Sequence, residues 1–527
     1  MSDDAIFAHA AVAAPHALAA QAGRDILIQG GNALEAMVAM AASIAVVYPH
    51  MNSIGGDGFW IIREPKGKVR AIEACGFAGE KATAASYEAL GGIPTRGPLA
   101  ALTVPGAVGG WKAAHELAEH LGGQLPLADI LGPAVAQART GVTISPSEER
   151  AQPRDGAGLY DAPGFKSTFF VDGAAPRAGQ HRKLAKLGET LAQLADAGLD
   201  DFYRGDIARE IAADLDKLGS PVTRADLKKY AARWREPLSI KTRQATLYNT
   251  PVPTQGLASL MILGIYERLG VKEIEGVDHA HALIEATKRA FAHRDRVCVD
   301  FDHVEEDFDA LLSPASMARE AAGIDMKRAA AWPLGPAKGD TIWMGAIDKD
   351  GLAVSYIQSV YWEYGSGVVL PSTGVMMQNR GIAFSLDPAS PRYLAPGRRP
   401  FHTLNPALAV FADGRVMSYG SMGGDGQPQF QAQVFTRIAA GDRLAAAVAA
   451  PRLLWGKTWG AESLTVKVEA AYDDSIAAGL ARRGHEIERL APARQDAFGH
   501  AGALRRGIKG EIEATHDPRA DGGAFGV

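Results

Sequence analysis

A stretch rich in proline and glycine divides this sequence into two parts of different character. Residues 333–340 read PLGPAKGD, a composition typical of a linker or loop. A strong hairpin pattern follows at once, with strands predicted at 341–348 and 352–359 around a Lys-Asp-Gly turn. Thr341 therefore opens a strand directly after a segment whose backbone is suited to cleavage.

A cut before Thr341 would place a free α-amino group beside the hydroxyl group of the same residue. An α-amino group has a pKa of about 7.7–8.0, so near neutral pH it can accept the proton of that hydroxyl. One residue would then supply both nucleophile and base. A threonine at a strand start also has a purely structural interpretation, and the residues alone leave both open.

Helical and strand patterns occur on both sides of the linker. Before it, the sequence predicts helices at 15–29, 36–48, 111–121, 184–197, 206–218 and 278–297, strands at 59–63 and 69–74, and long ordered loops at 85–110 and 145–182. After it, the sequence predicts a second hairpin and two late strands at 407–411, 416–420, 503–507 and 511–515. This pattern indicates α+β layers built on antiparallel sheets.

Composition argues against several classes of partner. The 527 residues include 55 Lys and Arg against 60 Asp and Glu, a net charge of −5, so no basic surplus is present to neutralise a nucleic-acid backbone. The longest apolar run, 36–48, is shorter than the roughly 20 residues that span a bilayer. The first residues lack the pattern of a secretory signal. We expect a cytoplasmic protein without nucleic-acid or membrane partners.

Metal-binding patterns are weak. The two cysteines, Cys75 and Cys298, are too few for a disulfide framework or a cysteine-rich zinc site. His115 and His120 lie five positions apart, which places them about 140° apart around a helix, whereas a zinc-binding pair needs a spacing of four. We expect no metal and no cofactor, and a zinc hydrolase is a distant alternative.

Six segments, in order along the chain, resemble the γ-glutamyltransferase family. They are residues 14–59, 103–111, 339–374, 397–410, 420–426 and 516–523. Members of this family are N-terminal nucleophile hydrolases with a four-layer αββα sandwich, and they cut themselves before a threonine into two fragments that stay together. The resemblance implies one interlocked α+β domain formed by 1–340 and 341–527, cut between Asp340 and Thr341. A dimer of this heterodimer is left open.

The resemblance also assigns catalytic roles. Thr341 matches the nucleophile, and Ser359 matches a hydroxyl residue that supports it. The backbone N–H groups of Gly423 and Gly424 match the oxyanion hole, a large contributor to catalysis in such enzymes. From the residues alone, Gly423 and Gly424 would be interpreted as a tight turn.

This chain departs from the family at the substrate. Members that take glutathione hold its α-carboxylate with an arginine near the place of Cys75. They hold its α-amino group with residues that match Tyr361, Arg380 and Ala383 here. An ammonium group would meet a cation at Arg380 and no carboxylate at Ala383, which is unfavourable. The loop between Phe384 and Arg399 is also short for a member with a lid.

These departures favour a substrate that has a carboxylate and no α-amino group. Arg380 is the candidate for binding the carboxylate, with a salt bridge that only orders the loop as the alternative. His402 and Thr403 replace a paired-serine motif, and both are further candidate substrate-binding residues, together with Tyr361.

The variant motifs resemble most the branch of the family that hydrolyses oxamate late in allantoin breakdown. The resemblance thus implies a self-processing amidohydrolase that converts a small acidic amide, such as oxamate, to oxalate and ammonia through an acyl-enzyme on Thr341. Acyltransferase activity is left open. The alternatives are a γ-glutamyltransferase or glutathione hydrolase, and an uncut family member that only binds its ligand.

Overall fold

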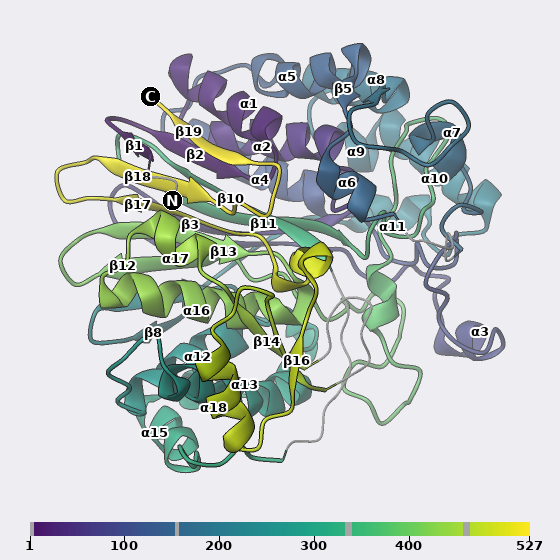
Figure 1. Cartoon of the computed structure of the whole chain (residues 1–527). Coiled ribbons are helices and arrows are strands. Elements are labelled where there is room, and N and C mark those ends of the chain that lie inside the picture. The colour runs from purple at the N-terminus through teal and green to yellow at the C-terminus, as the bar shows by residue number, and fades with distance from the viewer. Residues whose placement is uncertain (1–4, 153–157, 332–339, 457–463) are drawn as a thin grey trace.

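Two antiparallel sheets stacked face to face form the centre of the protein (Figure 1). The computed structural model describes residues 5–152, 158–331, 340–456 and 464–527, so the predicted linker at 333–339 lies outside the described residues. In spatial order, the first sheet contains β1 (Ala5–Phe7), β18 (Ile512–His516), β17 (Ala501–Arg506), β13 (Val416–Ser421), β12 (Ala407–Phe411), β9 (Ala245–Asn249) and β8 (Leu238–Lys241). The second contains β19 (Gly523–Gly526), β2 (Ala11–Ala14), β10 (Asp340–Ile347), β11 (Ala353–Tyr361), β3 (Asp57–Arg63), β4 (Val69–Ala74) and β7 (Arg233–Arg235).

Helices cover the outer face of each sheet. The second sheet packs against a layer that includes α1 (Ala17–Ile28), α2 (Ala33–Val47), α4 (Ala107–His120), α5 (Leu127–Thr140), α7 (Phe165–Phe169), α8 (Ala185–Ala197), α9 (Asp201–Arg204), α10 (Asp206–Leu218) and α11 (Arg224–Lys229). The first sheet packs against α12 (Gly256–Arg268), α13 (Val277–Val297), α14 (Phe308–Leu311), α15 (Pro314–Ala322), α16 (Gln427–Ala440), α17 (Leu444–Ala449) and α18 (Asp474–Arg482). The predicted αββα order is therefore confirmed.

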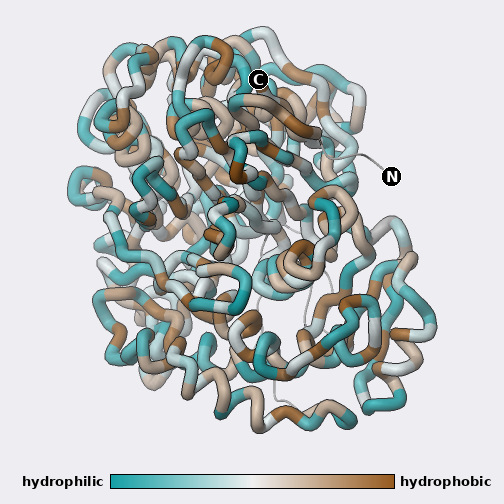
Figure 2. The backbone as a smooth tube through the Cα atoms, turned by 90° about the vertical axis from the view of Figure 1, so that its left-hand side faces the viewer, coloured by the Kyte–Doolittle hydropathy of each residue, from teal (hydrophilic) through white to brown (hydrophobic). Residues whose placement is uncertain are grey.

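Short elements lie at the edges of these layers. They are α3 (Ala84–Glu88), α6 (Pro146–Arg150), the small strands β5 (Val142–Thr143), β6 (His181–Arg182), β14 (Leu453–Trp455), β15 (Val466–Val468) and β16 (Ile487–Arg489), and the 3₁₀ turns η1 (Phe301–His303), η2 (Arg380–Ala383), η3 (Gly424–Gly426) and η4 (Pro492–Phe498). In Figure 2, hydrophobic and hydrophilic segments alternate along the outer helices, as expected for helices with one buried face. No helix in the described ranges combines the length and apolarity needed to cross a membrane.

Helix α2 shows why the longest apolar run is helical. The side chain of Asn32 accepts hydrogen bonds from the backbone N–H groups of Leu34 and Glu35, and the carboxylate of Glu35 accepts one from the N–H of Asn32, which completes a capping box. Every residue of the helix is buried. The predicted buried helix is thus confirmed, with its start three residues earlier than the apolar pattern indicated.

The predicted loop at 85–110 is partly wrong. It contains α3, and α4 begins at Ala107, four residues before the predicted start. Gly109 and Gly110 lie inside this helix because their missing side chains let it approach its neighbours. A Cβ on Gly110 would lie 2.6 Å from the Cβ of Ala74, and one on Gly109 would lie 2.7 Å from the ring of Tyr230. The predicted loop at 145–182 likewise contains α6 and α7.

Residues on both sides of the 340–341 bond contribute to both sheets. In the second sheet, β10 and β11 lie between β2 and β3. In the first sheet, β12 pairs with β9, and β18 pairs with β1. The division of the chain at this bond stays a prediction, but a chain cut there would have strands of both fragments interleaved.

Candidate active site

Thr341 lies at an irregularity near the start of β10. In the pairing of β10 with β11, Ile342 is opposite Gln358, whereas Asp340 is opposite Tyr361, so the register shifts at Thr341. Such bulges re-aim a side chain and are frequent beside active sites. Thr341 is fully buried. Only the backbone of Asp340 is described.

Three polar side chains form a row across neighbouring strands of the second sheet. Ser359 on β11 is opposite Asp57 on β3, and Thr341 follows on the other side of Ser359. Side chains alternate between the faces of a strand, and the residues two positions further along each strand lie in the core between the sheets: Trp343, Ile357 and Phe59. The row therefore faces the space between the two sheets, at one end of the sandwich.

Gln427 binds the hydroxyl group of Thr341. Its Nε2 donates a hydrogen bond to Thr341 Oγ1 at 2.7 Å, and Gln427 is the first residue of α16. Gln427 was not among the predicted site residues, although it directly follows the glycine-rich segment 420–426 that resembles the family. The bond fixes the direction of the hydroxyl oxygen in the buried site.

We expect Gln427→Ala to lower kcat for amide hydrolysis by about tenfold to a hundredfold, because a buried hydrogen bond to the nucleophile is lost. Gln433→Ala is the matched control. It removes an amide from the same helix, where Gln433 binds the backbone of Leu453 at 2.9 Å, and we expect wild-type kcat. Rates of ammonia release, measured on fully processed protein, test this. A Gln427→Ala variant as fast as the control would contradict it.

Gly423 and Gly424 form a turn that leads into α16. Their φ angles are 120° and 54°, and a Cβ on Gly423 would lie 2.8 Å from the ring of Phe430, so glycine is required there. Within the described part of the chain, neither N–H group has a hydrogen-bond acceptor. Two unpaired N–H groups on a rigid turn are suited to bind an oxyanion.

Gln255 joins this turn to the segment that contains His402 and Thr403. Its Nε2 donates to the carbonyl of Gly424 at 2.7 Å and to that of Thr403 at 2.8 Å. Its Oε1 accepts from Arg294 at 3.1 Å. These bonds fix the position of the Gly423–Gly424 turn relative to the segment of His402 and Thr403. Gln255 was not among the predicted site residues.

Arg380 presents a buried guanidinium group. Its side chain stacks on the ring of Tyr361 at 3.8 Å, and only 1% of the residue is exposed. Among the described residues, none of its three nitrogens has a hydrogen-bond acceptor or an ion pair. Burial lowers its pKa to about 10, against the opposing effect of Tyr361, Asp57 and Cys75. The salt bridge considered as an alternative role is therefore not found.

An unpaired buried charge costs several kcal/mol, so a site of this kind is expected to receive an anion. Tyr361 supports the position of the guanidinium. Its φ is 86°, which is uncommon for a residue with a side chain, and its N–H donates to Ser359 Oγ at 2.8 Å. Because Tyr361 is opposite Asp340 in the sheet, Arg380 lies close to the start of β10.

Asp57 and His402 belong to the same part of the site: Asp57 is opposite Ser359, whose Oγ accepts the N–H of Tyr361, the residue on whose ring Arg380 stacks. Asp57 Oδ1 accepts hydrogen bonds from the backbone of Gly76 at 3.1 Å and Gly106 at 2.9 Å, while Oδ2 is 3.5 Å from His402 Nε2. Burial raises the pKa of Asp57 to about 7, with Arg380 opposing the shift. Burial and the nearby arginines hold the pKa of His402 well below its usual range, so His402 is neutral.

The structure thus brings together the predicted site residues Thr341, Ser359, Tyr361, Arg380, His402, Thr403, Gly423 and Gly424. Asp57 was missed, because its sequence context reads as a glycine-rich turn. In the structure it is the first residue of β3. All these residues are buried or, for the two glycines, form the turn that closes the site.

Comparisons with known proteins agree with this geometry. A family profile described as gamma-glutamyltranspeptidase matches residues 19–527. The chain is 48% identical, over the whole of both chains, to the oxamate amidohydrolase proenzyme of Klebsiella pneumoniae. It is 37% identical, over 98% of each chain, to a glutathione hydrolase-like proenzyme of Bacillus subtilis. The chain belongs to the γ-glutamyltranspeptidase family.

Structural comparison supports the same assignment. A cephalosporin acylase from Bacillus halodurans superimposes with a TM-score of 0.91 and 33% identity, covering 100% of this chain and 97% of that one. The predicted resemblance and fold class are therefore confirmed. As a member of this family, the chain is a proenzyme-type amidohydrolase, and its class of reaction is hydrolysis of a C–N bond.

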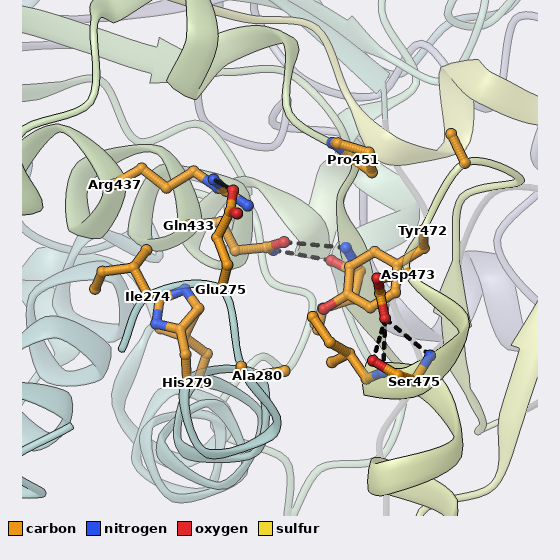
Figure 3. A pocket seen from close by; sticks show the side chains of 15 residues that line it. Ile274, Glu275, His279, Ala280, Gln433, Arg437, Pro451, Tyr472, Asp473 and Ser475 are labelled. Carbon is orange, nitrogen blue, oxygen red and sulfur yellow. Dashed lines mark hydrogen bonds and ion pairs between the residues drawn. The ribbon is translucent and has the colours of Figure 1, made fainter. Parts of the chain in front are cut away.

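Two further places were considered as sites. The first is a pocket of about 230 Å³ between α13, α16 and the segment before α18 (Figure 3). Its charged groups already have partners: Arg437 binds Glu275 at 2.7 Å, and Asp473 binds Ser475. None of the predicted site residues lines this pocket.

The second is a group with metal-ligand spacing within the described residues, His281, Glu285 and His485, whose ligand atoms lie within 4.8 Å of one another. The two histidines are hydrogen-bonded at 2.8 Å. The ammonium group of Lys288 lies 2.7 Å from Glu285 and already supplies a positive charge there. We interpret this group as packing α13 against the segment before β16. On α4, His115 is half-buried and His120 is exposed.

Proposed function

We propose that this protein hydrolyses oxamate to oxalate and ammonia after cutting itself between Asp340 and Thr341. The observation that carries the proposal is the buried guanidinium of Arg380, which has no hydrogen-bond acceptor among the described residues and lies near the start of β10, the strand that contains Thr341. In oxamate the carboxylate is bonded directly to the amide carbon, so its anion site must lie close to Thr341. The relative named oxamate amidohydrolase proenzyme supports the same substrate.

The cut would begin when Thr341 Oγ1 attacks the carbonyl carbon of Asp340. The peptide C–N bond breaks as an ester forms, and water then hydrolyses the ester. This step frees the α-amino group of Thr341, whose pKa of about 7.7–8.0 suits it to act as the base. Gln427 would hold the hydroxyl in place for attack through its 2.7 Å hydrogen bond.

In turnover, the amino group takes the proton of the hydroxyl while Oγ1 attacks the amide carbon of oxamate. The N–H groups of Gly423 and Gly424 would stabilise the negative oxygen of the tetrahedral intermediate. The C–N bond breaks, ammonia leaves with the transferred proton, and water hydrolyses the oxalyl ester. Oxamate and water thus give oxalate and ammonium, with Thr341 regenerated.

The place of Cys75 supports a change of substrate within the family. In members that use glutathione, the resemblance implies an arginine near this position. Here the position is a buried cysteine directly after β4, which offers a carboxylate no positive charge. Arg380 in η2 is the candidate that would bind the carboxylate instead, and it would also repel the α-ammonium group of a glutamyl substrate.

The test measures ammonia release from oxamate by purified protein whose cleavage has been verified by intact mass. We expect turnover of oxamate, and little or none of oxamide, which lacks the carboxylate, or of a chromogenic γ-glutamyl anilide. Correctly cut enzyme that releases no ammonia from oxamate would overturn the substrate. Turnover of the anilide instead would favour a γ-glutamyl hydrolase, and an uncut, inactive chain would favour a binding protein.

A further inference from the structure

We propose that Asp57 determines how tightly, and for which anions, the Arg380 site binds its substrate, because its carboxyl group competes with the substrate carboxylate for the guanidinium. This inference rests on the proposed function and adds a residue to it. Asp57 acts through Arg380 and is a positioning residue, not a catalytic one.

The geometry of Asp57 separates its two oxygens. Oδ1 is bound by the N–H groups of Gly76 and Gly106, which fixes the carboxyl group between the end of β4 and the start of α4. Oδ2 lies 3.5 Å from His402 Nε2, and the side chain of Gln378 also acts on the carboxyl group and lowers its pKa. One oxygen is therefore held by the backbone, and the other faces the side chains of the site.

Within this cluster, the charges of Asp57 and Arg380 act on each other. Besides His402, which is neutral, the titratable groups that interact with Asp57 are Cys75 at the end of β4, Tyr203 on α9, Tyr230 after α11, and Tyr356 on β11. Burial raises the pKa of each of these four groups, so they stay neutral near pH 7. Arg399, which forms an ion pair with Glu73 at 3.0 Å, acts on His402, Cys75 and Tyr230.

The protonation state of Asp57 thus sets the net charge that a substrate meets. When Asp57 is protonated, the Arg380 charge is unopposed and attracts a carboxylate. When Asp57 is ionised, its negative charge neutralises the guanidinium and repels the incoming anion. The raised pKa of about 7 places this change in the neutral range. Ionised Asp57 also disfavours a dianion more than a monoanion, which would help oxalate to leave.

The KM for oxamate should depend on pH through Asp57. Below about pH 7 Asp57 is mostly protonated, and KM should be constant. Above it, KM should rise, by up to about tenfold per pH unit when binding requires the protonated form. The α-amino group of Thr341 acts on kcat in the opposite direction, because loss of its proton creates the base. KM and kcat therefore report different groups.

The decisive variant is Asp57→Asn. An asparagine can keep both hydrogen bonds from Gly76 and Gly106, and it imitates the protonated acid without being able to ionise. We expect processed Asp57→Asn to show a KM for oxamate that stays flat between pH 6 and pH 9, while kcat keeps its wild-type pH profile. A change in fold alone would not remove the pH dependence of KM selectively.

Asp348→Asn is the matched control. Asp348 is a buried aspartate in the turn after β10 with a raised pKa, and it accepts hydrogen bonds from the backbone of Ala33 and Leu352, away from the candidate site. This variant should keep the wild-type rise of KM. A flat KM in the wild type, or a wild-type rise in Asp57→Asn, would overturn the role of Asp57.

A binding measurement separates this inference from the proposed reaction. Calorimetric titration of processed protein with oxalate gives an affinity that does not depend on turnover. We expect the wild-type affinity to fall above pH 7 and that of Asp57→Asn to stay constant. Loss of this difference would contradict the role of Asp57 even if oxamate is hydrolysed. If the difference holds and no ammonia is released, the proposed substrate fails and the anion site stands.

Discussion

Thr341→Ala is expected to remain a single chain of 55.6 kDa and to lose amide hydrolysis by about 10⁴-fold or more. Alanine has neither the hydroxyl that attacks the Asp340 carbonyl nor, without the cut, a free α-amino group to act as base. Intact mass and ammonia release from oxamate measure the two effects separately. Because Thr341 is a buried residue with one hydroxyl, the substitution should leave the fold intact.

Thr341→Ser is the control for this result. Serine keeps the hydroxyl that receives the Gln427 hydrogen bond, so cleavage and turnover should persist at a reduced rate. If Thr341→Ala were cut at the 340–341 bond, another group would have to perform the first attack. A wild-type chain that stays whole would remove the base from the proposed mechanism and favour the uncut binding protein.

Arg380→Met is expected to lower kcat/KM for oxamate by about 30-fold to several thousand-fold, the range found when one partner of a buried charge pair is truncated. Below about pH 7, where Asp57 is mostly protonated, the free energy of unfolding should stay equal or rise, because the unliganded protein no longer buries a guanidinium that has no hydrogen-bond acceptor among the described residues. Few active-site substitutions combine these two outcomes. Steady-state kinetics and thermal unfolding of the same preparation measure both.

Two comparisons sharpen this result. Arg380→Lys keeps the charge but not the planar fork that binds a carboxylate in two places, so an intermediate loss is expected. Oxamide, which is neutral, should discriminate little between the wild type and Arg380→Met. If Arg380→Met kept the wild-type kcat/KM for oxamate, the guanidinium would not bind the substrate carboxylate. A large loss of thermal stability would show that an unseen partner holds it.

The sequence predicted those parts of the site that are contiguous in the chain. The hairpin after Thr341 is present as β10 and β11, and Arg380 could be selected because a cation there contradicts an ammonium-binding pocket. The residues that surround them in space were harder to predict from the sequence. Gln427 reaches Thr341 only because a tight glycine turn brings the start of α16 to the nucleophile.

Asp57 could not be predicted for a second reason, the pairing of strands that are distant in the sequence. Its place beside Ser359 follows from the register of β3 with β11, which pairs residues about 300 positions apart, and no local pattern encodes that register. Its glycine neighbours also imitate a turn. The early start of α4 was not predicted for a related reason: Gly109 and Gly110 weaken a helix locally, and the close packing against Tyr230 and Ala74 that requires them is not visible in the local sequence.

Because the strands of the two fragments are interleaved, the uncut chain can fold in a way that the cut protein could not easily repeat. Strands β10 and β11 are inserted between β2 and β3, an arrangement that one continuous chain reaches by an intramolecular search. After cleavage the same arrangement would require two separate polypeptides to meet, so recovery from unfolding would become second order and slow down on dilution. The mature enzyme would then persist by resisting unfolding, and each molecule would have a single opportunity to fold.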